Sequence, residues 1–214
     1  MKNLEAQKLD ALIVSKQENI FYLTSFTSDS AALVVTPKKS FAITDFRYAE
    51  AADKQIIGRF ELVILNNTLN TFAKAIAHVL DKQKVKRIGF EPRTVTFAQY
   101  KNMKTAAGTR SLIPAEGMVE ALRETKDAEE IRGLLKALSI TKATLKEVKQ
   151  MLKPRATESA ILRYIKESFI RKGAEGAAFE PIVATQPGAS QPHYKTMSEK
   201  KLGNNKPILI DLGA

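Results

Sequence analysis

Asp211 and His193 are the residues whose types and positions suggest chemistry. Asp211 lies in the apolar run PILIDLGA at 207–214, which predicts a strand in a hydrophobic core. An ionised carboxylate inside a core costs several kcal/mol unless it is paired, hydrogen-bonded or bound to a metal. Asp211 is therefore a candidate metal ligand. An ion pair between this carboxylate and a Lys or Arg at the strand end is the alternative.

His193 is one of only two histidines and follows Gln191-Pro192 in a loop between two expected strands. Taken alone, it would be read as a surface-loop histidine, and the other histidine, His78, is interpreted as structural or solvated. One His and one Asp make neither a metal site nor a catalytic triad. A metal bound at Asp211 needs further ligands, and we expect those to lie beyond residue 214.

The composition excludes several classes of function. The chain has no cysteine, which rules out disulfides, thiolate metal sites and a cysteine nucleophile. This absence fits a reducing compartment, so we expect a cytoplasmic location. The first residues, MKNLEAQK, lack the apolar core of a signal peptide. No apolar stretch approaches the roughly 18–20 residues that span a bilayer, so we expect no membrane partner.

The formal net charge of +11 raises the question of nucleic-acid binding. The excess of Lys and Arg is spread over both halves of the chain, and there is no basic tail. The densest basic cluster, KQKVKR at 82–87, has no aromatic residues interleaved and falls between an expected helix and strand. Such clusters are typical of solvated loop ends, so we expect no nucleic-acid partner.

Residues 1–117 alternate strand and helix patterns, which predicts an α/β domain with a mixed sheet flanked by helices. Strands are expected at 11–14, 31–36, 40–45, 62–65 and 87–91, the second and third forming a hairpin. Helices are expected at 68–83, capped by Thr68, and at 94–107. Asp45 is expected to cap a helix near Phe46, and Glu91 is interpreted as an exposed acid at a strand end.

Residues 118–214 show a different pattern. Apolar residues at helical spacing predict a long amphipathic helix over 127–152 and a second helix from Thr157 to about Gly173. Strands are expected at 179–185 and 208–212, which predicts an α+β domain present only in part. Half of a curved sheet would leave an apolar face uncovered, including Ile182, Ile208 and Ile210. Such faces recruit partners, so we expect a homo-oligomer such as a dimer.

Several sequence phrases, in this order along the chain, resemble the Xaa-Pro aminopeptidase/prolidase family of pita-bread metallopeptidases. They are NIFYLT (19–24), AITDFRY (42–48), IGFE (88–91), LRETKDAEEI (122–131), TE (157–158), FEPIVA (179–184), PHY (192–194) and IDLGA (210–214). Each phrase alone is weak, but together they span nearly the whole chain. Gln186-Pro187 departs from the small residue and more open loop that the family usually has there. The resemblance implies a creatinase-like N-terminal domain over 1–117 and the first half of a pita-bread metallopeptidase domain over 118–214.

The resemblance also implies roles for the two candidate residues. Asp211 matches the first of five ligands to two divalent metal ions (Mn, Co or Zn), and His193 matches a histidine that contacts the substrate without binding metal. Two metal ions share a hydroxide that attacks an amide carbonyl. The other ligands, an Asp, a His and two Glu, are expected in the second half of the fold. The chain alone is thus expected to bind no metal and to carry an incomplete site.

Three functional classes follow. The first is an Xaa-Pro aminopeptidase-type metallopeptidase that removes the residue before a proline from proline-containing peptides, acting as an aminopeptidase or as a dipeptidase. The alternative is a metal-free member of the same fold that binds peptides or proteins. The third, nucleic-acid binding, rests on net charge alone.

Overall fold

The computed structural model describes residues 2–56, 60–197 and 199–214. The chain forms two compact units, residues 1–125 and residues 126–214. Helix α6 (Glu120–Glu124) belongs to the first unit by this division. The domain boundary after residue 117 stays a prediction.

The first unit is built on a mixed six-stranded sheet in the order β4-β3-β2-β1-β5-β6. The β2–β3 pair is the expected antiparallel hairpin; β1 pairs antiparallel with β2, and the other neighbouring pairs are parallel. This confirms the mixed sheet that the sequence predicts. The strands are β1 (Ala11–Val14), β2 (Ala31–Val35), β3 (Ser40–Thr44), β4 (Phe60–Ile64), β5 (Arg87–Phe90) and β6 (Ser111–Pro114).

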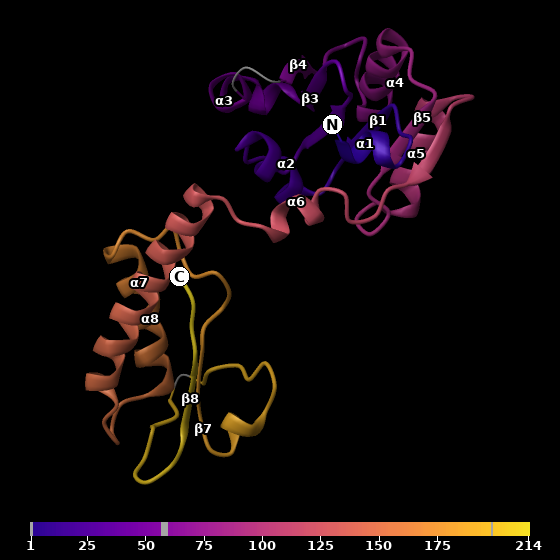
Figure 1. The fold of residues 1–214 in the computed structure, drawn as a ribbon. Helices are drawn as coiled ribbons and strands as arrows, with labels where there is room; N and C mark the ends of the chain where they lie inside the picture. The colour runs from indigo at the N-terminus through magenta and orange to yellow at the C-terminus, as the bar shows by residue number, and fades with distance from the viewer. Residues whose placement is uncertain (1, 57–59, 198) are drawn as a thin grey trace. The chain divides into compact units, whose positions relative to one another are not determined.

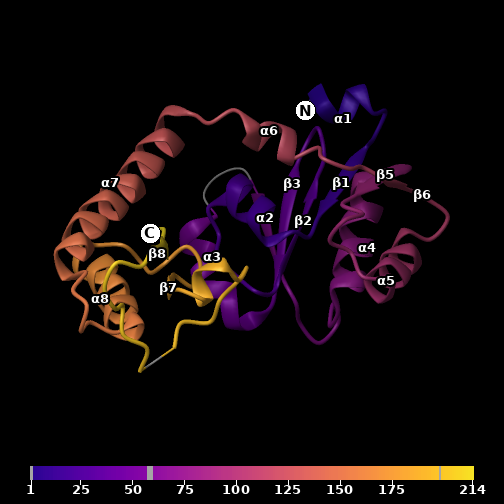
Figure 2. The same ribbon diagram turned by 90° about the horizontal axis from the view of Figure 1, so that it is seen from below.

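Both faces of this sheet are covered. Ala11 and Ile13 of β1 join a core packed under α4 and α5, whereas Leu12 and Val14 join the opposite core. This alternation follows from the two-residue period of a strand, and it explains why all four residues of β1 are buried. Figures 1 and 2 show α4 and α5 beside one face of the sheet and α2 beside the other. The helices are α1 (Lys2–Ala6), α2 (Gln17–Thr24), α3 (Ala49–Gln55), α4 (Phe72–Gln83) and α5 (Phe97–Ala107), with a 3-10 turn η1 (Phe46–Tyr48) before α3.

The caps of these helices correct one expectation. Helix α4 begins after Thr71, whose hydroxyl accepts a bond from the Lys74 amide, so the prediction that Thr68 caps it is wrong. Thr68 instead donates its amide to the Asn66 side chain at 2.9 Å, because Asn66 closes a turn there. Asp45 caps η1, as predicted.

The second unit begins with the predicted helical hairpin, α7 (Ala128–Met151) and α8 (Glu158–Arg171). Asp127 caps α7 in a capping box with Glu130, and Thr157 caps α8 by accepting a bond from the Ala160 amide. These caps confirm the start of both helices. Figure 1 shows the two helices side by side.

A two-stranded antiparallel sheet, β7 (Ile182–Thr185) and β8 (Ile208–Asp211), packs against these helices. The expectation that Ile208 and Ile210 lie on an uncovered face is wrong, because both are half-buried against the core of this unit. Ile182, which pairs with Asp211, is also half-buried but is not part of that core. Leu209, which points to the other face, is 42% exposed. The core is built from Ile140, Val148, Ile161, Ile165, Phe169, Val183 and Leu202.

The first half of α7 exposes a row of large apolar side chains at helical spacing. Four of them are between 44% and 59% exposed: Ile131, Leu134, Leu135 and Leu138. Only the later part of the amphipathic stripe, including Ile140 and Val148, is buried. No helix in the described part of the chain is long and apolar enough to cross a bilayer.

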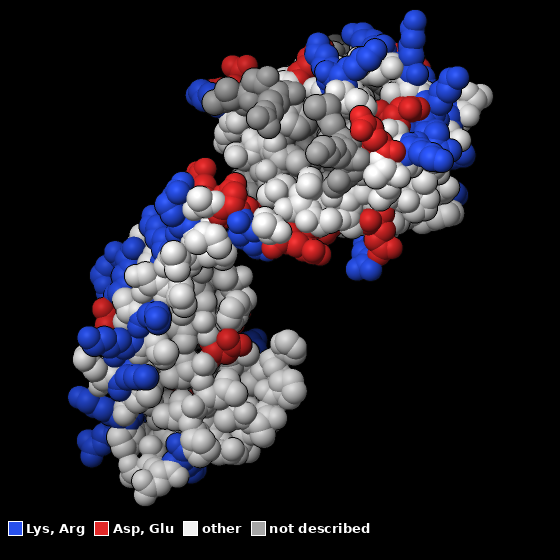
Figure 3. Space-filling model, viewed as in Figure 1, with Lys and Arg blue, Asp and Glu red and all other residues white. Residues whose placement is uncertain are grey.

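Lys and Arg side chains are distributed in several groups rather than on one continuous face in the view of Figure 3, where acidic and uncharged residues separate them. Several basic groups also carry ion pairs, including Arg110 with Asp81 and Lys172 with Glu147. The positive charge of these basic side chains is thus partly offset locally.

Candidate functional site

Asp211 is the last residue of β8 and pairs in register with Ile182 of β7. Its side chain is exposed, so the premise that it sits inside a core is wrong. The reason is the period of the strand: Ile208 and Ile210 point to the helices, and Leu209 and Asp211 point away. Among the described residues, the Asp211 carboxylate has no hydrogen bond or ion pair, which leaves both oxygens open to a ligand.

His193 lies in the loop after the short 3-10 turn η2 (Gly188–Ser190) and is exposed. Its φ is +52°, a left-handed conformation that is unusual for a residue with a side chain. No described residue hydrogen-bonds to its imidazole. The structure thus places both candidate residues in the segment that starts with β7 and ends with β8, and it shows no direct contact between them.

The described residues alone do not fit a dinuclear metal centre. Such a centre needs several carboxylate or imidazole donors gathered around two hard cations. No group of three or more His, Cys, Asp or Glu side chains with metal-binding geometry occurs in the described part of the chain. Asp211 is a single donor, so a complete centre requires ligands other than those described.

A buried acid close to His193 escaped the sequence analysis. Glu158, the first residue of α8, is completely buried. Its Oε1 accepts bonds from the amide and hydroxyl of Thr185 at 2.9 and 3.0 Å, and its Oε2 accepts bonds from the Tyr194 hydroxyl at 2.9 Å and the Met197 amide at 3.2 Å. The Lys200 ammonium lies 3.3 Å from Oε1.

These contacts determine the protonation states of Glu158 and Lys200. Burial, the largest single effect, raises the pKa of Glu158, but the bonds from the Thr185 and Met197 amides and the two hydroxyls outweigh it, so the net pKa is lowered. Burial also lowers the pKa of Lys200, and the bonds with Tyr194 and Glu158 outweigh that effect and raise it. Both groups therefore stay charged at neutral pH. In the sequence, Glu158 stood out only as part of the family phrase TE at 157–158.

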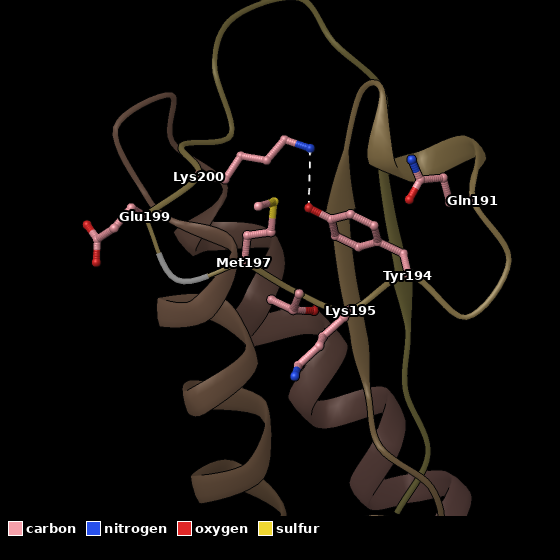
Figure 4. Close-up of a pocket in the computed structure, with 7 residues that line it drawn as sticks. Gln191, Tyr194, Lys195, Met197, Glu199 and Lys200 are labelled. Carbon is pink, nitrogen blue, oxygen red and sulfur yellow. Dashed lines mark hydrogen bonds between the residues drawn. The ribbon is translucent and has the colours of Figure 1, made fainter.

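The loop between β7 and β8, which carries His193, forms the wall of an open pocket of about 680 Å³. Figure 4 shows Tyr194 and Lys200 facing one another across it, with the Lys200 ammonium 3.4 Å from the Tyr194 hydroxyl. Met197 lies below Lys200 and beside Tyr194 in this view, and Glu199 points away from the pair. The pocket is thus bounded by residues on both sides of His193 in the chain, Gln191 before it and residues 194–197, 199 and 200 after it.

Glu91 in the first unit also differs from its interpretation. It is only 7% exposed, so the expectation of an exposed strand-end acid is wrong. Its carboxylate accepts bonds from the amides of Ser15 and Lys16 at 2.7 and 2.8 Å and from the Asn19 side chain at 2.5 Å. The two amides lie at the start of α2, where an acceptor satisfies donors that the helix itself cannot. Glu91 therefore joins β5 to α2, a structural role.

Comparison with known proteins places this architecture in a family. Residues 1–125 match the creatinase/prolidase N-terminal domain, and residues 132–214 match metallopeptidase family M24. An uncharacterized peptidase of Bacillus subtilis is 29% identical over 215 residues, covering 100% of this chain and 60% of that protein. A putative Xaa-Pro aminopeptidase of Mycoplasma genitalium is 29% identical over 196 residues, covering 90% of this chain and 52% of that protein.

A solved structure of a related protein has the same fold as this chain. An Xaa-Pro dipeptidase from Bacillus anthracis superposes with a TM-score of 0.90 at 27% identity, over 100% of this chain and 58% of that one. The chain spans little more than half the length of the relatives it matches. The mixed sheet and the helical hairpin followed by β7 and β8 therefore agree with the fold that the sequence phrases imply. The chain belongs to the creatinase/prolidase family, with that family's N-terminal domain followed by sequence of metallopeptidase family M24.

Proposed function

We propose that this chain forms the N-terminal domain, residues 1–117, and the first part of the catalytic domain, residues 118–214, of an Xaa-Pro aminopeptidase-type metallopeptidase. The observation that carries the proposal is the placement of His193 after β7 and Asp211 at the end of β8, within the region that matches metallopeptidase family M24. The similarity to a putative Xaa-Pro aminopeptidase supports the reaction class. The substrates are peptides with proline in the second position.

Asp211 is proposed to be a metal ligand. An exposed carboxylate with no partner among the described residues, at the end of a strand held in register, is available to a cation without first breaking an ion pair. Two divalent ions (Mn, Co or Zn), when bound, would supply an activated water for attack on the peptide carbonyl. The other ligands are proposed to come from the part of the relatives' length that this chain does not span.

His193 is proposed to contact the substrate near the scissile bond rather than to bind metal. Its imidazole is exposed and has no described partner, so both ring nitrogens are open to a substrate. The homo-oligomeric state and the cytoplasmic location belong to the same proposal. The exposed Leu209 is consistent with a contact between chains.

A second candidate function is a metal-free member of the fold that binds peptides or proteins. The observation in its favour is the exposed His193 imidazole, which has no described partner and can contact a peptide whether or not metal is bound. The two functions differ in one measurable property, because only the first requires metal.

An activity assay of the full-length protein tests the proposal. Release of the N-terminal residue from an Xaa-Pro peptide and from its Xaa-Ala counterpart is followed after addition of Mn²⁺, Co²⁺ or Zn²⁺. We expect metal-dependent release from the Xaa-Pro peptide, abolished by Asp211→Asn and unaffected by Glu175→Gln, an exposed acid of the same unit. We expect no turnover by the 214-residue chain alone, since it offers one ligand. Absence of turnover together with saturable peptide binding would favour the metal-free alternative.

A further inference from the structure

Every described partner of the buried Glu158 carboxylate is a donor. Thr185 donates an amide and a hydroxyl, Tyr194 a hydroxyl, Met197 an amide and Lys200 an ammonium. A carboxylate with two accepting oxygens satisfies all of them. A glutamine would turn its NH₂ group toward one of these two sets of donors, where a hydroxyl can reverse its role and accept but the backbone amide of Thr185 or Met197 is left without an acceptor. Charge and atom type are therefore specified at this position.

The donors tie α8 to the end of β7 and to the loop that follows it. Thr185 is the last residue of β7, and Tyr194, Met197 and Lys200 lie in the loop that leads towards β8. Lys200 reinforces the closure by donating to the Thr185 carbonyl at 2.8 Å. The carboxylate that accepts these bonds belongs to the first turn of a helix. The loop is therefore held against a rigid element.

Tyr194, the residue after His193, is held on two sides. Its hydroxyl donates to Glu158, and its ring packs so closely over Gly188 that a Cβ built there would lie 2.4 Å from the ring. The Lys200 ammonium also lies 5.1 Å from the centre of the ring. His193 itself adopts φ +52°, a conformation that persists only where neighbouring structure enforces it.

We propose that Glu158 is a positioning residue that fixes residues 194–197 and Lys200 of the loop after β7 and thereby presents the His193 imidazole in one place to a peptide substrate. Glu158 touches neither substrate nor metal in this role and acts through Tyr194. The proposal rests on the substrate-contacting role given to His193 under the proposed function. The hold of Glu158 on the loop follows from its hydrogen bonds alone.

The loop is tested first in the 214-residue chain, without any activity. Limited trypsin digestion reports cleavage after Lys195, and hydrogen exchange reports the amides of residues 194–197. We expect Glu158→Gln to raise both rates by about tenfold or more, since one backbone amide loses its acceptor and the carboxylate charge that faces Lys200 is removed. Exchange in the buried residues of α8, Ile161 to Phe169, should stay slow and show that the unit is folded.

Two further variants keep this test falsifiable. Glu199→Gln makes the same chemical change in an exposed acid of the same loop and should leave both rates unchanged. Tyr194→Phe removes one donor while keeping the ring over Gly188, and it should give a smaller increase than Glu158→Gln. Equal rates in wild type and Glu158→Gln, or an equal increase in Glu199→Gln, would overturn the proposal.

A double-mutant cycle in the full-length protein then tests the link to His193. We expect Glu158→Gln to lower kcat about tenfold when His193 is present and to have little effect in the His193→Ala background. A purely structural role would lower kcat equally in both backgrounds and would overturn the proposal. If His193→Ala alone leaves activity unchanged, the role given to His193 fails, whereas the digestion result still decides whether Glu158 holds the loop.

Discussion

Replacing Glu91 with Ala should destabilise the first unit strongly, because three short hydrogen bonds end on its carboxylate. The donors are the amides of Ser15 and Lys16 and the side chain of Asn19, at 2.7, 2.8 and 2.5 Å. Asn19 is fully buried and Glu91 is 7% exposed, so water cannot readily replace the lost acceptor.

The magnitude follows from the number of donors left unsatisfied. Each buried donor that loses its acceptor costs about 1–3 kcal/mol, and part of this cost is recovered where the amides of Ser15 and Lys16 relax towards solvent. We therefore expect Glu91→Ala to lower the free energy of unfolding of the first unit by about 3–5 kcal/mol. This should lower the melting temperature by about 10–20 °C.

The measurement is urea unfolding followed by circular dichroism, with hydrogen exchange of residues 11–24 to assign the loss to the first unit. Glu116→Gln is the matched control, an acid of the same unit whose side chain is 53% exposed and pairs with Arg93. It should change stability by less than about 0.5 kcal/mol. A Glu91→Ala variant as stable as the control would refute the reasoning that a buried carboxylate joins β5 to α2.

Two more predictions concern the second unit. Phe169→Ala should lower its free energy of unfolding by about 3–5 kcal/mol in chemical denaturation, because the fully buried ring leaves a cavity in the core, whereas Ile170→Ala, at a site 58% exposed, should have little effect. Glu147 has its pKa lowered from 4.5 to about 2, chiefly by the hydrogen bond from Lys172. Its contribution to stability is thus full above pH 4.5 and is lost as the pH falls towards 2, and Glu147→Gln should flatten the melting temperature against pH over that range. An unchanged slope in Glu147→Gln would contradict this assignment.

The sequence predicted those elements whose local signals agree with their packing. Asp127 and Thr157 precede long amphipathic helices, and both cap them in the structure. Thr68 carries a similar signal, but the Asn66 side chain closes a turn across it and the helix begins after Thr71. A capping residue therefore predicts a helix start only where no neighbouring side chain competes for the same amides.

The site was predicted less completely because burial depends on contacts between distant segments. Asp211 lies in an apolar run that suggests burial, yet the pleat of β8 turns it outward. Glu158 lies at a helix start that suggests exposure, yet Thr185 and Met197, far along the chain, enclose it. A single sequence does not reveal which loop residues return to cover a helix N-terminus. The resemblance to a family located His193 and Asp211 but gave no reason to single out Glu158.

The metal content of the full-length protein tests the central claim most directly. The protein is purified from medium containing Mn²⁺, Co²⁺ and Zn²⁺, and the ions retained per chain are counted by mass spectrometry in wild type, Asp211→Asn and Glu175→Gln. We predict two divalent ions per chain in wild type and in Glu175→Gln, and loss of metal in Asp211→Asn at unchanged melting temperature in the metal-free state. Full retention of metal by Asp211→Asn would contradict the assignment of Asp211 as a ligand.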